Sequence, residues 1–212
     1  YDHAYRVLTD MTPPIKVMLT TYFGALGDNL ETALKLPVHG LHIDVVRAPE
    51  QLAEVASRAR ADQVLSLGVI DGRNVWKADL NAVLDRIEPL VAAGRQVVVA
   101  PSCSLLHTPI DLERVAALDP EIRVWLAFAV QKVRELATLA RALAEGREAV
   151  RVDLDASSAS AAARRTSSPT HDPKVQARAA DADPALSRRP SGFEIRRQVQ
   201  RRRLNLPADG VK

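Results

Sequence analysis

The stretch "VLSLGVIDGRNVWKADLNAVLDRIEPLVAAGRQVVVAPSCS" (residues 64–104) reads as a strand, a helix and a second strand, and this order decides the fold. Residues 64–70 and 96–100 are almost entirely apolar, as is typical of strands buried on both faces. Between them, apolar residues recur at three- and four-residue steps over 79–94, and Gly94 is a suitable helix stop. A strand–helix–strand unit of this kind predicts parallel pairing of its two strands.

The same alternation extends toward the N-terminus. Apolar runs at 15–21 and 41–46 predict two further strands, and helical spacing recurs over 27–37 and 48–61. We therefore expect an α/β fold with four parallel strands in neighbouring order and helices on the outer face. An open doubly wound sheet fits this pattern, and so does about half of a (β/α)8 TIM-type barrel, which needs about 250 residues when complete.

If the fold is half of a barrel, one face of the sheet lines the barrel interior. We assign to that interior face Val17, Leu19, Ile43, Val45, Leu65, Leu67, Val97 and Val99. Half a barrel would leave these side chains without an opposite wall.

A single long helix is predicted after the fourth strand. Asp119 is a suitable N-cap and Pro120 suits the first helical position. Apolar residues then recur at helical spacing as far as Gly146, which would close the helix.

The composition changes after residue 150. Residues 151–190 are small, polar and basic, which predicts a poorly ordered linker, and 193–207 reads as a short basic helix. We therefore divide the chain into a partial barrel domain, 1–146, and a basic, partly disordered linker segment, 147–212.

The charge and the motif content exclude several classes of protein. The chain has 29 Lys and Arg residues against 26 Asp and Glu, and this net charge of +3 does not indicate a nucleic-acid partner. No apolar run reaches the roughly 20 residues that span a membrane. The single cysteine excludes an internal disulfide framework and is typical of a reducing compartment, so we expect a cytoplasmic protein. No GxGxxG, GxxxxGK[ST] or HExxH pattern is present, which argues against the commonest nucleotide and metalloprotease sites.

Polar residues gather where the predicted strands end. In parallel α/β folds, ligands bind at the carboxyl ends of the strands. The candidate substrate-binding residues at these ends are Asp44, Asp71, Asn74, Trp76, Ser102, Ser104 and His107.

Several of these residues have more than one interpretation. Cys103 and His107 resemble half of a zinc site or a nucleophile–base pair, but no second cysteine exists and a small buried thiol is favoured. Asp44 is equally well read as a catalytic carboxylate and as a cap of the next helix. Trp76 either stacks on a flat ligand or packs. We predict no catalytic residue and no metal ligand in this chain.

Four motifs resemble, in the same order and spacing, the amino-terminal barrel of the cobalamin-independent methionine synthase family. They are "LTTYFGALGDNL" (19–30), "LPVHGLHIDVV" (36–46), "LSLGVIDGRNVWKADL" (65–80) and "SCSLLHTPIDL" (102–112). Further along, "HDPKVQAR" (171–178) and "RRQVQRRRLNLP" (196–207) resemble the stretch that leads to that family's second barrel.

The resemblance implies a protein of methionine biosynthesis that transfers a methyl group from 5-methyltetrahydrofolate polyglutamate to homocysteine. In the family, zinc is held by the second barrel and the first barrel helps to hold the folate. This chain would then be the second half of the first barrel plus the linker, with Cys103 a relic of a zinc ligand and no cofactor of its own.

The family pattern also continues beyond both ends of this chain, which begins at Tyr1 rather than Met. We therefore expect a fragment that is inactive alone. Two alternatives stay open: one subunit of a split methyltransferase whose complementary chain carries the catalytic barrel, and a small-ligand-binding α/β module without catalysis.

Overall fold

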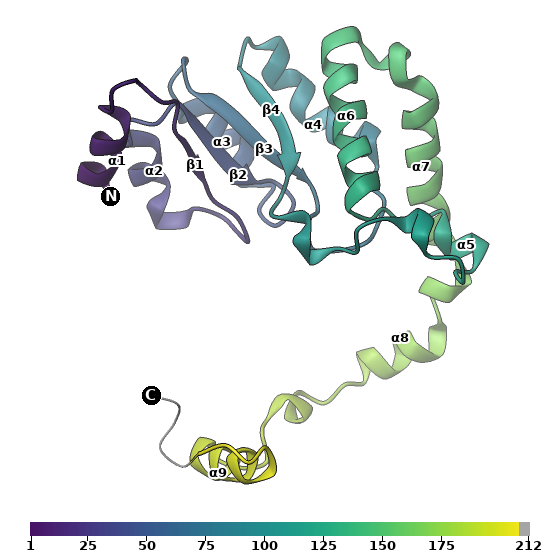
Figure 1. Ribbon diagram of the computed structural model, residues 1–212. Coiled ribbons are helices and arrows are strands. Elements are labelled where there is room, and N and C mark those ends of the chain that lie inside the picture. The colour runs from purple at the N-terminus through teal and green to yellow at the C-terminus, as the bar shows by residue number, and fades with distance from the viewer. Residues whose placement is uncertain (208–212) are drawn as a thin grey trace. The chain divides into compact units, whose positions relative to one another are not determined.

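The computed structural model describes residues 1–207, and the chain divides into two compact units. The first unit consists of residues 1–165 and contains the whole sheet (Figure 1). The second unit begins at Thr166 and contains only helices and connecting segments among its described residues.

The sheet has four parallel strands in the order β1, β2, β3, β4 (Figure 1). They are β1 (Met18–Thr20), β2 (Gly40–Asp44), β3 (Val64–Ile70) and β4 (Val97–Pro101). The predicted parallel pairing and neighbouring order are therefore confirmed. The first strand is shorter than predicted, and the third has the predicted bounds.

One face of the sheet is covered by helices. They are α2 (Leu30–Lys35), α3 (Gln51–Arg58), α4 (Leu80–Ala92) and α6 (Ala129–Glu145). All four helices contribute side chains to a single buried core that also contains Leu41, Leu65 and Leu67 of the sheet. Because burying one such side chain contributes about 1.5–3 kcal/mol, this layer is the main source of stability in the first unit.

The assignment of the barrel-interior face is wrong. The register aligns Leu19, Leu41, Leu65 and Val97 in one row, and this row belongs to the helix-side core. Ile43, Leu67 and Val99 also belong to this core, so these side chains pack against the helices.

The opposite face of the sheet is more polar and more open. Successive residues of a strand point to opposite faces, so the next row is Thr20, His42, Ser66 and Val98. His42 and Ser66 are buried, whereas Thr20 and Val98 are exposed. The apolar runs in the sequence did not show which face of the sheet the helices cover, because β4 has apolar residues in both rows.

The predicted long helix is interrupted. Asp119 caps α5 (Pro120–Arg123) as expected, its side chain accepting from the Glu121 amide. The chain then turns at Val124 and Trp125, and Leu126 pairs with Trp76 in an isolated antiparallel bridge before α6 begins. The helical spacing of the apolar residues did not reveal this break, because the buried segment 125–128 satisfies its backbone by pairing with another loop.

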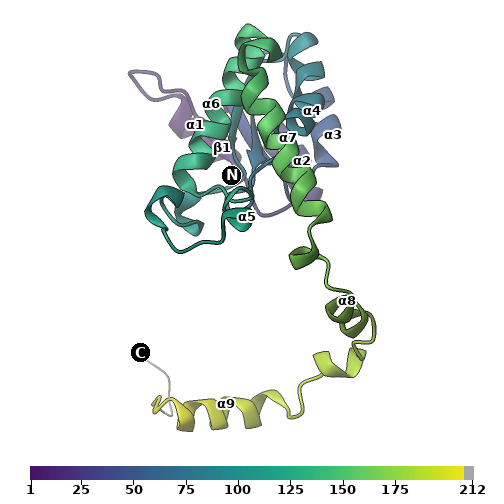
Figure 2. The same ribbon diagram turned by 90° about the vertical axis from the view of Figure 1, so that its right-hand side faces the viewer.

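The prediction that residues 151–166 are irregular is also wrong, because they form helix α7 (Arg151–Thr166). Leu154 of α7 joins the main core, and Ser157 and Ala161 are buried. Figures 1 and 2 show α4, α6 and α7 side by side. The first unit therefore extends past the boundary at 146/147 that the composition suggested.

The remaining helices are α1 (Asp2–Thr9) before the sheet and α8 (Pro173–Ala180) and α9 (Phe193–Arg203) in the second unit. The predicted basic helix is confirmed as α9, which ends before Pro207. Helices α8 and α9 bury no residue.

Candidate functional site

Asp44 ties together the loops that follow β1 and β2. Its Oδ2 accepts from the Phe23 amide at 3.0 Å, and its Oδ1 accepts from the amides of Val46 and Arg47 at 3.0 and 2.8 Å. The side chain is fully buried. The sequence left open a catalytic carboxylate and a cap of the next helix. The carboxylate instead holds the loops at Phe23 and at Val46–Arg47, and α3 has no side-chain cap.

Ser102 joins the end of β4 to the loop after β3. It is buried, its amide donates to the Ile70 carbonyl at 2.7 Å, and its Oγ accepts from the Gly72 amide at 3.2 Å. A Cβ on Gly72 would lie 2.7 Å from the Cys103 carbonyl oxygen and 2.9 Å from its Sγ. The two loops therefore meet closely because residue 72 has no side chain.

Cys103 is buried and is poorly suited to act as a nucleophile. Burial raises the pKa of its thiol, and the negative charges of Asp44 and Asp71 act in the same direction. Since the thiolate is the reactive form, a raised pKa disfavours nucleophilic chemistry. The sulfur lies 3.8 Å from the Ser104 carbonyl oxygen, a long contact.

An aromatic and cationic rim surrounds these strand ends. The Phe23 ring lies 6.0 Å from the His107 ring, and the Arg73 guanidinium lies 4.8 Å from the Phe23 centroid. His107 and Ser104 are exposed on the loop after β4, where the Ser104 Oγ accepts from the Leu106 amide at 3.3 Å. Both are free to contact a ligand at the rim.

The loop after β3 is fixed by a chain of local hydrogen bonds. Asp71 accepts from the Arg73 amide at 2.8 Å and from the Asn74 side-chain amide at 2.6 Å. The Asn74 Oδ1 in turn accepts from the Trp76 amide at 3.0 Å. These contacts fix the conformation of the loop from Asp71 to Trp76.

A pocket of about 400 Å³ lies behind this loop. Asp71, Asn74 and Trp76 line it together with the N-terminal part of α4 and the C-terminal part of α7. Its remaining charged lining residues are Lys77, Asp79, Arg86, Arg164 and Arg165. We refer to it as the α4–α7 pocket.

Cations predominate on the walls of the α4–α7 pocket. The Arg164 guanidinium lies 4.8 Å from the Trp76 ring centroid, a cation–π arrangement. Arg165 lies 3.6 Å from Asp79. The pocket therefore suits a ligand that carries both a flat ring and negative charge.

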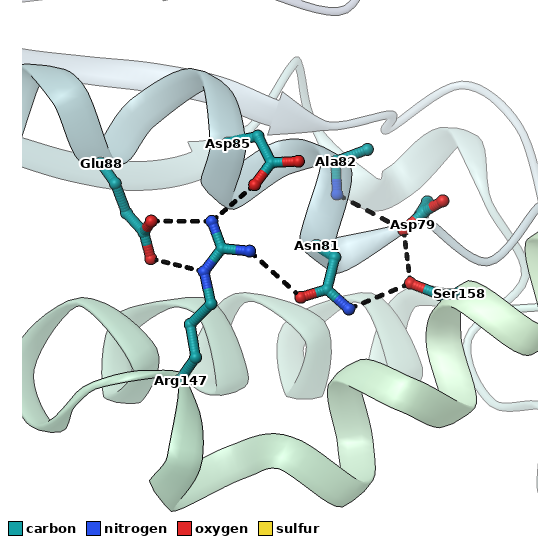
Figure 3. A network of polar contacts seen from close by, with 7 residues as sticks. All are labelled: Asp79, Asn81, Ala82, Asp85, Glu88, Arg147 and Ser158. Carbon is teal, nitrogen blue, oxygen red and sulfur yellow. Dashed lines mark hydrogen bonds and ion pairs between the residues drawn. The ribbon is translucent and has the colours of Figure 1, made fainter.

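A polar network holds α7 beside α4 and so shapes this pocket (Figure 3). Asp79 caps α4 and accepts from Ser158 of α7 at 2.8 Å. At the other end, Arg147 binds Glu88 through two nitrogens at 2.8 and 2.7 Å and Asp85 at 2.6 Å. Sequence reasoning missed Arg164 and Arg165 because it did not predict α7.

Two buried ionisable residues of α6 were also missed. Lys132 and Glu135 are almost inaccessible and share the buried face of α6 with Leu139 and Ala142. Burial lowers the pKa of Lys132 and raises the pKa of Glu135, and their mutual attraction opposes both shifts. The signal for them was present, since these four positions recur at helical spacing.

A buried histidine lies on the open face of the sheet. His42 Nδ1 is 2.8 Å from the Ser66 Oγ. Burial lowers the pKa of His42, with the Ser102 backbone and Asp44 partly opposing that shift. The imidazole is therefore held in its neutral form near neutral pH.

Zinc, which the resemblance implies for the whole family, does not fit the residues of this chain. Within residues 1–207, no three His, Cys, Asp or Glu side chains gather closely enough to hold a metal ion. Cys103 carries a raised pKa, whereas a metal ligand must be a thiolate. No step proposed below passes through a metal.

The structure thus separates the sequence-predicted residues into three groups. Asp44 and Ser102 are buried supports of the strand-end loops. Ser104 and His107 lie on an exposed rim. The third group, Asp71, Asn74 and Trp76, lines the α4–α7 pocket.

No described helix combines the length and apolarity that crossing a bilayer requires.

The family comparison matches the start of the chain. Residues 1–95 match the model of the cobalamin-independent synthase N-terminal domain. These residues contain β1, β2, β3 and the helices between them.

Individual relatives match nearly the whole chain. A 5-methyltetrahydropteroyltriglutamate–homocysteine methyltransferase of Caulobacter vibrioides is 59% identical over 206 residues, which is 96% of this chain and 26% of the relative. Proteins of the same name from Mesorhizobium japonicum and Nitrobacter winogradskyi are each 56% identical, over 97% and 96% of this chain and 27% of the relatives. The chain therefore belongs to the cobalamin-independent methionine synthase family and spans 26% to 27% of the length of these relatives.

Proposed function

We propose that this chain forms part of a methyltransferase of methionine biosynthesis that converts 5-methyltetrahydropteroyltriglutamate and homocysteine. The observation that supports this most strongly is the 59% identity to a relative of that name over 96% of the chain. The matched region covers 96% of the chain, so it includes the loops at the strand ends as well as the core. A cytoplasmic location, expected from the single cysteine, is part of the same proposal.

Within that protein, the proposed role of this chain is to bind the folate substrate. Asn74 and Trp76 line a pocket whose cationic walls suit the negative charges of a glutamate tail and whose indole suits a flat ring. Ser104 and His107 are proposed as rim contacts. Asp44 and Ser102 act indirectly, by holding the loops that carry the contacting residues.

The four strands are proposed to form about half of a (β/α)8 barrel. The sheet is parallel, its order is sequential, and helices α2, α3, α4 and α6 share one face, as the strands and helices of a barrel do. The remaining strands, the zinc and the homocysteine contacts would come from polypeptide that this chain does not contain. The chain alone is then not expected to form methionine.

Titration with 5-methyltetrahydropteroyltriglutamate, followed by calorimetry, tests the binding role. Saturable binding is expected, and Trp76→Ala should weaken it by about 1 kcal/mol, or roughly fivefold. Phe193→Ala, which removes an exposed aromatic ring of the second unit, is the control and should bind as the parent does. Binding that is insensitive to Trp76→Ala would contradict the proposed contact.

A second candidate function is a small-anion-binding module without catalysis, favoured by the cations that line the α4–α7 pocket. The same titration with inorganic phosphate distinguishes the anion-binding module from the methyltransferase role. Saturable binding of phosphate, with none of the pteroyltriglutamate, would favour the module over the methyltransferase.

A further inference from the structure

The segment Val75–Ala78 carries the indole wall of the α4–α7 pocket, and its backbone is held from two sides. On one side, the Lys77 amide donates to the Trp125 carbonyl and the Ala127 amide donates to the Val75 carbonyl, both at 2.8 Å. These bonds are the ones expected of a short antiparallel pair.

On the other side, two charged side chains of α6 replace a backbone partner. Lys132 Nζ donates to the Trp76 carbonyl at 3.1 Å, and Glu135 Oε1 accepts from the Ala78 amide at 3.0 Å. Lys132 and Glu135 are 0% and 7% exposed. The two residues lie one turn apart on α6, so a single rigid element sets both contacts.

Placing two ionisable groups in this core is costly. Moving a charged group out of water is unfavourable, and apolar side chains of similar volume often stabilise a core as well or better. Within residues 1–207, Glu135 Oε2 is buried without a hydrogen-bond partner. Packing alone therefore does not explain a lysine and a glutamate at these positions, whereas holding a particular loop does.

We propose that Lys132 and Glu135 are positioning residues that clamp the segment Trp76–Ala78 and thereby fix the Trp76 indole as a wall of the α4–α7 pocket. Trp76 is 39% exposed, and the Arg164 guanidinium covers one part of its ring. Without the clamp, the carbonyl of Trp76 and the amide of Ala78 lose their partners, and the indole is expected to move toward water. The inference rests on the proposed function only in treating this pocket as a ligand site.

Tryptophan fluorescence tests the clamp without any ligand, so its outcome is independent of the substrate titration. The chain contains two tryptophans, and Trp125→Phe leaves Trp76 as the only one. That replacement is suitable because Trp125 is buried and its indole nitrogen has no hydrogen-bond partner within the described residues. Quenching of Trp76 by acrylamide then reports the exposure of the pocket wall.

In this background, Lys132→Met and Glu135→Met remove the two contacts while keeping much of the side-chain volume. Each should raise the quenching constant of Trp76 about twofold and shift its emission to the red. Glu135→Gln keeps an oxygen that can accept from the Ala78 amide and should behave as the parent does. Arg134→Met, on the exposed side of the same helix, is the control and should also leave the quenching unchanged.

Circular dichroism shows whether Lys132→Met still folds. If it does not, the comparison of Glu135→Met with Glu135→Gln tests the proposal. Equal quenching in these two variants would overturn the proposal. So would parent-like quenching in a folded Lys132→Met variant.

Discussion

Gly72 and His42 show how single residues determine the strand-end region. Gly72 lets two loops touch where any side chain would collide with Cys103. His42 occupies a buried position on the sheet face that no helix of the main core covers. Neither residue is proposed to contact a ligand, but Gly72 allows the loops after β3 and β4 to meet and His42 bonds to Ser66 within the sheet.

Replacing Gly72 with alanine is expected to destabilise the first unit. The new Cβ would lie 2.7 Å from the Cys103 carbonyl oxygen, so backbone must move. Overpacking of this kind costs about 1–3 kcal/mol, which should lower the urea midpoint without changing the slope. Gly192→Ala is the matched control, because nothing lies within 4 Å of its added Cβ. An unchanged midpoint in Gly72→Ala would show that the loops are not packed as described.

Stability should fall as the pH is lowered below the usual pKa of histidine, about 6.5. Burial lowers the pKa of His42 in the folded chain, so the unfolded chain takes up the proton first. The contribution of this group is therefore present above about pH 6.5 and is lost as the pH falls toward the folded pKa. Free energies of unfolding in urea at about pH 7.5 and about pH 5.5 measure the loss.

The variant His42→Gln should lose less stability between these two pH values than the parent. His107→Gln, at an exposed position, serves as the control and should keep the parental loss. A His42→Gln variant with the full parental pH dependence would contradict the assignment of this titration to His42.

Part of this site was predictable residue by residue. Strand-end position was enough to expect Asn74 and Trp76 beside a pocket, because parallel strands bring their carboxyl ends to one edge, and both residues line the α4–α7 pocket. The distinction between contact and support was not predictable. Asp44 and Asp71 look alike in the sequence and both accept hydrogen bonds, but Asp44 is fully buried under three amides whereas Asp71 lines a pocket.

Helix α7 is the element that shows most clearly where sequence reasoning falls short. Its small serine and alanine side chains give it the composition of a linker. Of its buried residues, only Leu154 is a large apolar one. The helix is held instead by hydrogen bonds whose partners lie more than thirty residues away, such as the bond from Ser160 Oγ to the carbonyl of Val124, 36 positions earlier in the chain. Local composition cannot report contacts of that kind.

Ser157→Ala tests how α7 is held. The Ser157 Oγ accepts from the Leu80 amide at 3.1 Å and donates to the Leu154 carbonyl at 2.8 Å, in a buried position. The alanine variant leaves the first-turn amide of α4 without its partner, at a cost of about 1–3 kcal/mol. Thermal unfolding followed by circular dichroism measures the loss.

The chain offers a close control for this substitution. Ser57 of α3 also donates to the carbonyl three residues earlier, at 2.9 Å, but it is exposed and accepts no buried amide. Ser57→Ala should therefore change the midpoint little. Equal effects of the two substitutions would mean that Ser157 does not hold α7 to α4.

For the molecule as a whole, the open edges of the sheet are the decisive feature. Among the described strands, β1 pairs only with β2 and β4 only with β3, so both outer strands have an unpaired side. Unpaired strand edges favour association with other strands. Val98 and Met18 are also 46% and 41% exposed, which adds apolar surface near both edges.

We therefore expect the chain to associate in solution. Light scattering coupled to size exclusion should give a mass above that of one chain, 23.1 kDa. Val98→Lys places a charge on the open face of β4 and should shift the mass toward that of the monomer. Val175→Lys, at an exposed position of α8, is the control and should leave the mass unchanged. A parent chain that runs as a stable monomer would contradict this expectation.

The central proposal is that this chain forms one part of a methyltransferase and does not form methionine alone. The most direct measurement is methionine formation by two proteins: this chain alone, and the Caulobacter vibrioides relative with its 206 matching residues replaced by those of this chain. We predict no methionine from the chain alone and, from the hybrid, a rate within about tenfold of the relative's own, a difference of about 1.4 kcal/mol in barrier height. Methionine formed by the chain alone, or a folded hybrid that forms none, would contradict the claim.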